Sequence, residues 1–154
     1  HNRPAQGTWF TPGGRVRKGE AIAQALLRVA TDELGVPPAN AQRWLGRAQL
    51  LGAYDHFYTD SAFDAHTSTP YVNLPHGLRL SPADMDTLQP CLPRGEQAPE
   101  HQDGRYLTQH HQWRWLTPEA DRMAEQPSHP YVQPYLEWAR LNERTTFDSV
   151  WRLR

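Results

Sequence analysis

The segment from Gly14 to Val36, GRVRKGEAIAQALLRVATDELGV, constrains the fold more than any other part of the sequence. Apolar side chains recur in it at helical spacing, which predicts a helix that begins near Glu20. Gly35 is placed to end this helix as a C-cap. Carboxylates cluster near the end of the helix, and carboxylate oxygens are the ligands that Mg²⁺ and Mn²⁺ prefer. The segment therefore predicts a loop and a helix that together could hold a divalent cation.

The charged residues of this segment allow two interpretations. Arg28 and Asp32 are four residues apart, so they could form an ordinary ion pair on a helix surface. Alternatively, the whole spaced set of glycines, carboxylates and arginine could form a metal site. The register of the complete set favours the metal site.

The same spacing closely resembles the signature of the Nudix hydrolases, a loop-helix-loop that holds a divalent metal against a diphosphate. The residues that match its structural frame are Gly14, Glu20, Arg28 and Asp32. The chain departs from the signature at Val29, where the family has a glutamate, and that glutamate would share a helix face with Glu33. The protein is therefore either a degraded Nudix domain or an enzyme that takes its base from elsewhere.

Sequence blocks outside the helix favour the second option. Residues 2–14, NRPAQGTWFTPGG, are similar to the GDP-mannose mannosyl hydrolase branch of the Nudix superfamily, which also lacks that glutamate. Further blocks at 56–58, 69–72 and 109–116 follow in the order of that branch. The resemblance covers roughly residues 2–117, in separated blocks. It implies hydrolysis of a GDP-sugar, GDP-mannose or GDP-glucose, by attack of water at the anomeric carbon.

The resemblance also implies a metal site. The Gly13 carbonyl, the Glu33 carboxylate and the Gln109 side chain would hold one Mg²⁺ or Mn²⁺. An insertion at about 97–109 makes Gln97 a competing ligand. Gln109 is preferred because its spacing to the following Trp-Arg-Trp run is preserved.

Catalytic and substrate-binding roles follow from the same resemblance. His110 would take a proton from the attacking water, and a histidine suits this role because its unperturbed pKa is about 6.5. Arg15 and Tyr71 would stabilise charge on the departing diphosphate. His56 would contact substrate, and Tyr58 would stack on the nucleotide base. Two other histidines compete with His110 as base, namely His111 and His101.

Composition limits the partners and the compartment. The formal net charge of −1 gives no indication of a nucleic-acid partner. No apolar stretch approaches the length that spans a membrane. The single cysteine, Cys91, excludes an internal disulfide and fits a reducing compartment, so we expect a cytoplasmic protein. The resemblance further implies a homodimer.

We expect an α+β fold, the Nudix α/β/α sandwich with a mixed sheet, in a single domain over 1–154. The family pattern implies that the N-terminal β-hairpin is missing from this chain, so the domain would be N-terminally incomplete. Helices are predicted near 39–45, from Thr117 and over 134–141, and strands within 48–58 and 70–80. The stretch from Ser81 to about Gln109 reads as a proline- and charge-rich excursion.

Two alternative functions remain open at this point. The first is a Nudix pyrophosphohydrolase that cleaves a nucleoside diphosphate derivative between its phosphates. The second is a catalytically silent Nudix module that only binds a nucleotide. Val29 disfavours the first, and the insertion together with the missing hairpin keeps the second open.

Overall fold

The computed structural model describes residues 8–61, 64, 66–92, 113–142 and 150–153. These residues divide into two compact units. The first unit comprises His1–Thr11, Leu50–Gly77 and Arg114–Arg154, and the second comprises Pro12–Gln49 and Leu78–Trp113. Helices and antiparallel strands occur together, so the predicted α+β class is confirmed.

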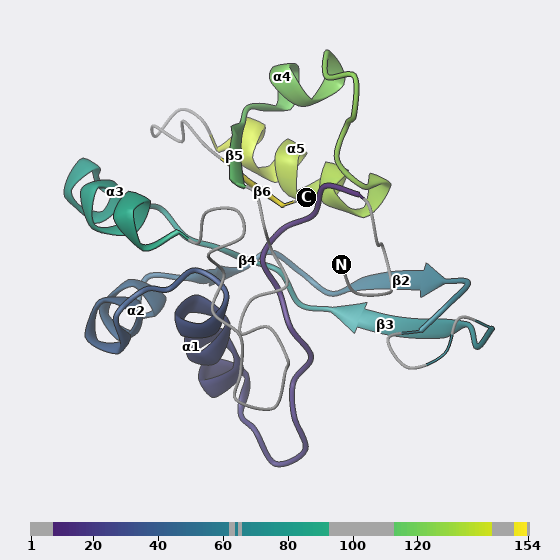
Figure 1. Ribbon diagram of the computed structural model, residues 1–154, viewed down its shortest axis with the longest axis horizontal. Coiled ribbons are helices and arrows are strands. Elements are labelled where there is room, and N and C mark those ends of the chain that lie inside the picture. Colours follow the sequence, from purple (N-terminus) through teal and green to yellow (C-terminus); the bar gives the residue numbers. More distant parts are fainter. Residues whose placement is uncertain (1–7, 62–63, 65, 93–112, 143–149, 154) are drawn as a thin grey trace. The chain divides into compact units, whose positions relative to one another are not determined.

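The second unit is helical and contains the segment singled out above. Helix α1 (Ile22–Asp32) packs against α2 (Pro38–Leu45), and Figure 1 shows the two helices side by side. The predicted helix is thus confirmed, although its C-cap is Glu33 rather than Gly35. Gly35 follows with φ +65°, and the chain then returns so that the Val36 N–H donates to the Ala30 carbonyl at 3.2 Å. A glycine fits here because side chains rarely tolerate this backbone conformation.

The stretch after Ser81, for which the sequence analysis predicted no helix, begins with helical structure. It begins with α3 (Pro82–Leu88) and continues into the short 3-10 helix η1 (Gln89–Cys91). Ser81 is the N-cap of α3, and its side chain and Asp84 form a capping box. Proline is compatible with this helix because it stands in the first turn, where its missing N–H is not needed. The rest of the stretch, 93–109, lies outside the described residues.

A buried carboxylate joins α3 to α2 within this unit. Asp84 is 5% exposed, and its Oδ1 accepts a 2.6 Å hydrogen bond from the buried indole of Trp44. Its Oδ2 accepts from the Arg47 guanidinium at 2.8 Å. Further bonds come from Arg43 and from the backbone and hydroxyl of Ser81. Asp84 is therefore the main polar link between the two helices.

The first unit is built on an antiparallel hairpin. Strand β2 (Tyr54–Tyr58) pairs with β3 (Thr69–Asn73), with His56 opposite Tyr71. Short strands β1 (Gln49–Leu50) and β4 (His76–Gly77) pair with each other, as do β5 (Trp113–Leu116) and β6 (Val150–Leu153). In the described ranges the sheets are thus two-stranded pairs.

The core of this unit lies between the hairpin and the C-terminal helices. These are α4 (Pro118–Arg122), the 3-10 helix η3 (Pro130–Val132) and α5 (Gln133–Leu141). Thr117 accepts a hydrogen bond from the Ala120 N–H, so the predicted N-cap is confirmed. The buried cluster consists of Leu116, Val132, Tyr135 and Leu136, with Phe10, Leu51 and Tyr54 packed against it. Within the described ranges, no helix combines the length and the apolar character that crossing a bilayer requires.

Candidate functional site

The loop before α1 is held by an ion pair between two predicted frame residues. Arg28 Nε and Nη2 donate to the two oxygens of Glu20 at 2.8 and 2.9 Å, a two-point contact that suits a guanidinium. Glu20 also accepts from the Arg17 backbone N–H at 2.8 Å, and Arg28 Nη2 donates to the Arg15 carbonyl at 2.8 Å. The hydrogen bond from Arg28, followed by the one from the Arg17 backbone, lowers the pKa of Glu20 to about 2. Arg28 therefore fixes the loop instead of pairing with Asp32.

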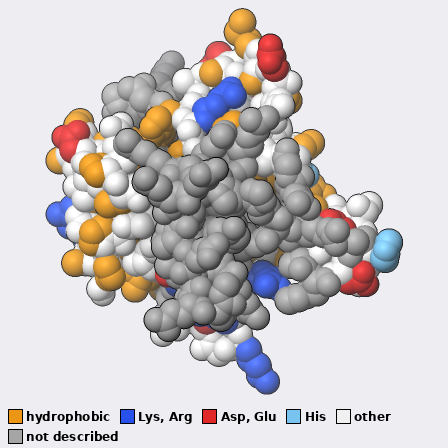
Figure 2. All heavy atoms as spheres, viewed as in Figure 1, with side chains coloured by type: hydrophobic (Ala, Val, Ile, Leu, Met, Phe, Trp, Pro, Cys, Tyr) orange, Lys and Arg blue, Asp and Glu red, His pale blue; other side chains and the backbone are white. Residues whose placement is uncertain are grey.

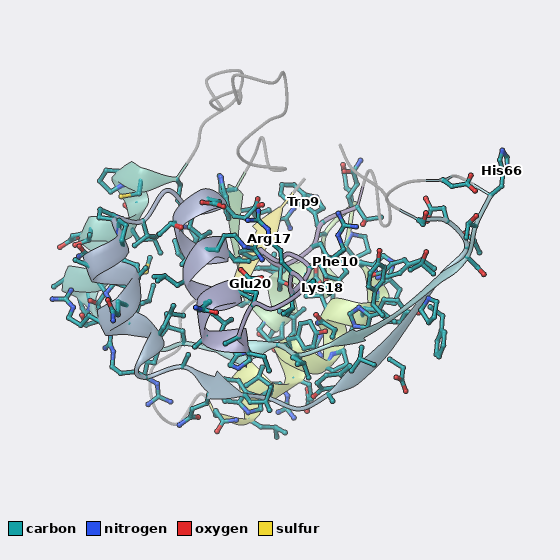
Figure 3. The ribbon with its side chains drawn as sticks, turned by 90° about the horizontal axis from the view of Figure 1, so that it is seen from below. Trp9, Phe10, Arg17, Lys18, Glu20 and His66 are labelled. Carbon is teal, nitrogen blue, oxygen red and sulfur yellow. The ribbon has the colours of Figure 1, made fainter. Side chains whose placement is uncertain are left out.

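This loop presents basic side chains to solvent. Residues 13–19 are exposed, and they include Arg15, Arg17 and Lys18. Figure 2 shows a Lys or Arg side chain reaching outward at the tip of the loop, and Figure 3 labels Arg17, Lys18 and Glu20 on it. Because Arg28 and Glu20 hold the backbone, the loop offers positive charge on a preorganised support. An anionic ligand such as a diphosphate would be favoured there.

The predicted metal ligands of this unit lie at the loop and at the end of α1. Glu33 is 8% exposed and caps the helix, where its N–H donates to the Val29 carbonyl at 2.9 Å. Gly13 stands in the exposed loop. A carbonyl and a carboxylate are suitable donors for a hard divalent cation. Among the described residues, no group of three His, Cys, Asp or Glu side chains could hold a metal ion, and the third predicted ligand, Gln109, lies outside them.

Val29 occupies the position where the missing carboxylate would stand. It lies one helical turn before Glu33. Its Cγ2 is 3.3 Å from the position that a Cβ on Gly14 would take, so the loop approaches the helix closely at this point. The helix thus presents a methyl group to the loop beside the predicted metal ligand.

The predicted substrate residues of the first unit lie in an aromatic cluster. The rings of His56 and Tyr131 stack with centroids 4.1 Å apart and an interplanar angle of 6°. Tyr58 packs edge-on against Tyr71 at 6.0 Å and against Tyr131 at 5.5 Å. The aromatic cluster comprises Phe10, His56, Tyr58, Tyr71, His129 and Tyr131. Three of the residues that the sequence predicted for substrate contact therefore lie together.

The cluster also contains residues that sequence reasoning missed. His129 caps η3, where its Nδ1 accepts from the Tyr131 N–H at 3.2 Å. The Tyr131 hydroxyl bonds to both the N–H and the carbonyl of Phe57, at 2.8 and 2.9 Å, and so covers the outer edge of β2. No local sequence signal pointed to His129 and Tyr131, because their contacts with β2 arise from tertiary packing.

The cluster is electrically neutral at neutral pH. Burial, and secondarily the charge of His129, lowers the pKa of His56, and burial also lowers the pKa of His129. Burial raises the pKa of Tyr58, so its hydroxyl stays protonated. The cluster contains no Lys or Arg. It is therefore suited to an uncharged part of a ligand rather than to a phosphate.

The remaining predicted residues fall in a part of the chain that the structure does not describe. The predicted base and its competitors lie outside the described residues, as does the 97–109 insertion. These residues are Gln97, His101, Gln109, His110 and His111.

Comparison with known proteins identifies the family. The NUDIX domain family matches residues 1–138. The chain is also 34% identical over 136 residues to the low-salt glycan biosynthesis protein Agl8 of Haloferax volcanii. That alignment covers 88% of this chain and 67% of Agl8. The match spans the loop, α1 and the hairpin. The chain therefore belongs to the Nudix domain family, the family of the Nudix hydrolases.

Proposed function

We propose that this protein hydrolyses a GDP-sugar, GDP-mannose or GDP-glucose, to the free sugar and GDP by attack of water at the anomeric carbon. Nudix hydrolases generally act on nucleotide derivatives with the help of a divalent metal. The observation that carries the finer proposal is the methyl group of Val29 beside Glu33 and the Gly14 loop.

Attack at phosphorus and attack at carbon make different demands on this site. Water that attacks a phosphate needs strong activation, which clustered carboxylates beside the metal can supply. Attack at an anomeric carbon passes through an oxocarbenium-like state, and a diphosphate is a good leaving group that needs no general acid. Helix α1 presents Val29 where a carboxylate could stand, and this fits attack at the anomeric carbon better than attack at phosphorus.

The relative supports a sugar-containing substrate. Agl8 carries the description of a glycan biosynthesis protein, and glycan synthesis consumes nucleotide sugars as activated donors. Within the first unit the aromatic cluster is neutral and suits uncharged groups, and within the second unit the loop is basic and suits a phosphate. A nucleotide sugar has a charged diphosphate and uncharged groups on either side of it.

We assign the following roles within this proposal. Gly13, Glu33 and Gln109 would hold Mg²⁺ or Mn²⁺, which when bound acts as a Lewis acid on the diphosphate. Arg15 would neutralise charge that develops on the diphosphate, from a backbone held by Arg28. His110 would accept the proton of the attacking water.

Tyr71, His56 and Tyr58 would bind the substrate from the hairpin. We further propose that residues 1–154 act as one Nudix domain, since the family match runs through both units.

Product identity tests the proposal. The protein is incubated with GDP-mannose and Mg²⁺, and the products are identified by phosphorus and proton NMR. GDP with free mannose supports the proposal, whereas GMP with mannose 1-phosphate indicates a pyrophosphohydrolase. Bound nucleotide without any product indicates a silent module.

A carboxylate variant links the reaction to the predicted metal ligand. Glu33→Gln keeps the size of the side chain but removes its charge, so we expect kcat to fall at least 100-fold, on the order seen for loss of a key catalytic interaction. The matched control is Glu125→Gln, which alters an exposed carboxylate and should leave kcat unchanged. A Glu33→Gln variant with full activity contradicts the assignment.

A further inference from the structure

A chain of hydrogen bonds runs through the aromatic cluster and ends at Tyr58. The Asn73 Nδ2 donates to the Tyr135 hydroxyl at 2.5 Å. The Tyr135 hydroxyl lies 3.1 Å from His56 Nε2, and the Tyr58 hydroxyl lies 3.3 Å from His56 Nδ1. Each ring nitrogen of His56 thus faces one tyrosine hydroxyl, and the direction of these bonds depends on the tautomer of His56.

With the Asn73 amide oriented as in the structure, counting protons favours one direction of hydrogen bonding. Asn73 Nδ2 can only donate, so it occupies a lone pair of the Tyr135 oxygen. If His56 carried its proton on Nε2, that proton would also point at the Tyr135 oxygen, and the Tyr135 proton would have no acceptor among the described residues. Tyr135 is 4% exposed, and a buried hydroxyl proton without an acceptor is unfavourable. The other tautomer satisfies every group, with Tyr135 donating to Nε2 and Nδ1–H donating to Tyr58.

The His56 ring is held firmly enough to keep this direction of its hydrogen bonds. His56 is 3% exposed, and its ring stacks on Tyr131. Tyr131 is in turn bonded to the backbone of Phe57, the neighbour of His56 on β2. A flip of the imidazole would place ring carbons where its two nitrogens stand and would break both tyrosine contacts, so the ring keeps its orientation.

We propose that Asn73 and Tyr135 hold His56 in its Nδ1–H tautomer, so that Tyr58 keeps its own hydroxyl proton to donate to an uncharged oxygen of the nucleotide-sugar substrate. Tyr58 accepts from His56, so its proton is directed elsewhere, and the described residues offer it no other partner. Its side chain is half-buried. Tyr135 and Asn73 are positioning residues in this arrangement, and the inference rests on the proposed function for the identity of the ligand.

Because the surroundings of Tyr58 are uncharged, the ligand oxygen that it would contact should be uncharged too. The aromatic cluster carries no cation that would draw a phosphate towards it. A sugar hydroxyl and a base carbonyl share the chemistry that a neutral donor among aromatic rings can recognise. Binding of GDP compared with binding of GDP-mannose distinguishes a base oxygen from a sugar oxygen.

The tautomer is measured first, in the free protein. Long-range proton–nitrogen spectra of ¹⁵N-histidine-labelled protein report which ring nitrogen carries the proton, and His56→Gln assigns the signal. We expect Nδ1–H in the wild type and a shift towards Nε2–H in Tyr135→Phe, which cannot donate. Nε2–H in the wild type overturns the inference whatever the enzyme does.

The substrate contact is measured next, with three variants and one control. Tyr58→Phe and Tyr135→Phe should each lower kcat/KM for GDP-mannose roughly five- to tenfold, the usual effect of losing one neutral hydrogen bond. The double variant should fall no further than either single variant, because both changes remove the same donated proton. Tyr54→Phe is the matched control, since Tyr54 packs on Tyr135 at 5.4 Å but lies outside the chain of hydrogen bonds.

Equilibrium binding identifies the oxygen and separates the two proposals. Weaker binding of both GDP and GDP-mannose to Tyr58→Phe indicates a base oxygen, and weaker binding of GDP-mannose alone indicates a sugar oxygen. Unchanged binding and unchanged kcat/KM in an active enzyme overturn the inference but leave the proposed function standing. A wild-type protein that binds GDP-mannose without hydrolysing it contradicts the proposed function only, and one that binds neither ligand overturns both.

Discussion

Asp84 provides the sharpest prediction about what holds the helical unit together. Asp84→Asn keeps the shape of the side chain but replaces one acceptor oxygen by an NH₂ group. Oδ1 faces the Trp44 indole and Arg43, and Oδ2 faces Arg47 and both donors of Ser81. The new NH₂ group therefore faces at least two donors in either orientation.

The expected loss follows from the least damaging orientation. An NH₂ group on the Oδ1 side leaves the indole N–H of Trp44, a residue 2% exposed, without its acceptor, which costs about 1–3 kcal/mol. Loss of the negative charge also weakens the contact with Arg47, whose side chain is 48% exposed, by roughly 0.2–1 kcal/mol. We expect the free energy of unfolding to fall by about 3 kcal/mol. For a chain of this size that corresponds to a Tm lower by roughly 6–12 °C.

The loss of stability caused by Asp84→Asn should be smaller in strong acid than at neutral pH. Burial alone would raise the pKa of Asp84, but hydrogen bonds from Arg47, Ser81 and Trp44 outweigh it, so the native pKa lies below the ordinary value of 3.8. The stabilisation is therefore present above pH 3.8 and is lost as the pH falls through the lower native pKa. The difference in Tm between wild type and variant should shrink in strong acid.

Urea and thermal unfolding, followed by circular dichroism, measure this difference. Asp86→Asn is the matched control, because Asp86 lies on the same helix and is exposed. It should change the free energy of unfolding by less than about 0.5 kcal/mol. Equal stability of the two variants would refute the argument that Asp84 links α2 to α3.

Two further predictions concern the loop-helix segment. Gly35→Ala should lower the free energy of unfolding by at least about 2 kcal/mol, because φ is +65° and the new Cβ would lie 2.5 Å from the Cys91 carbonyl oxygen. Gly46→Ala, at φ −60° with its nearest atom 3.6 Å away, should be neutral or slightly stabilising in the same urea titration, and equal losses would contradict the steric argument. The Glu20 carboxyl should titrate near pH 2 by carbon-13 NMR, because Arg28 and then the Arg17 N–H stabilise its charged form. In Arg28→Gln the midpoint should rise towards 4.5, and an unchanged midpoint would show that Arg28 is not the cause.

The sequence predicted the loop-helix segment well because its signals are local. Helical spacing placed α1, and the spaced signature named the residues that hold the loop. The partner of Arg28 could not be read from helical spacing alone, which offered Asp32 at one turn. Only the folded loop brings Glu20 to the guanidinium, eight residues away.

Helix α3 was missed although its signal was present. The stretch is rich in proline and charged residues, yet Ser81, Pro82 and Asp84 form a helix start in which proline is tolerated. The helix was missed because the composition of the stretch was considered and the positions of its helix-starting residues were not. The same residue that completes the capping box, Asp84, also carries the contacts to α2, which no local rule could reveal.

The aromatic cluster shows where sequence reasoning reaches its limit. His56, Tyr58 and Tyr71 were named because they stand in recognisable blocks of the hairpin. His129, Tyr131 and Tyr135 follow about seventy residues later, and their contacts arise from tertiary packing of the C-terminal helices on β2. The metal and catalytic assignments stay predictions, since Gln109 and His110 lie outside the described residues.

The most direct test of the central claim is hydrolysis of GDP-mannose in ¹⁸O-labelled water with Mg²⁺, followed by mass spectrometry of both products. Attack at the anomeric carbon places the label in the free mannose and leaves GDP unlabelled. Label in GDP, or in GMP or mannose 1-phosphate, means that water attacked phosphorus, and it would contradict the account built on Val29.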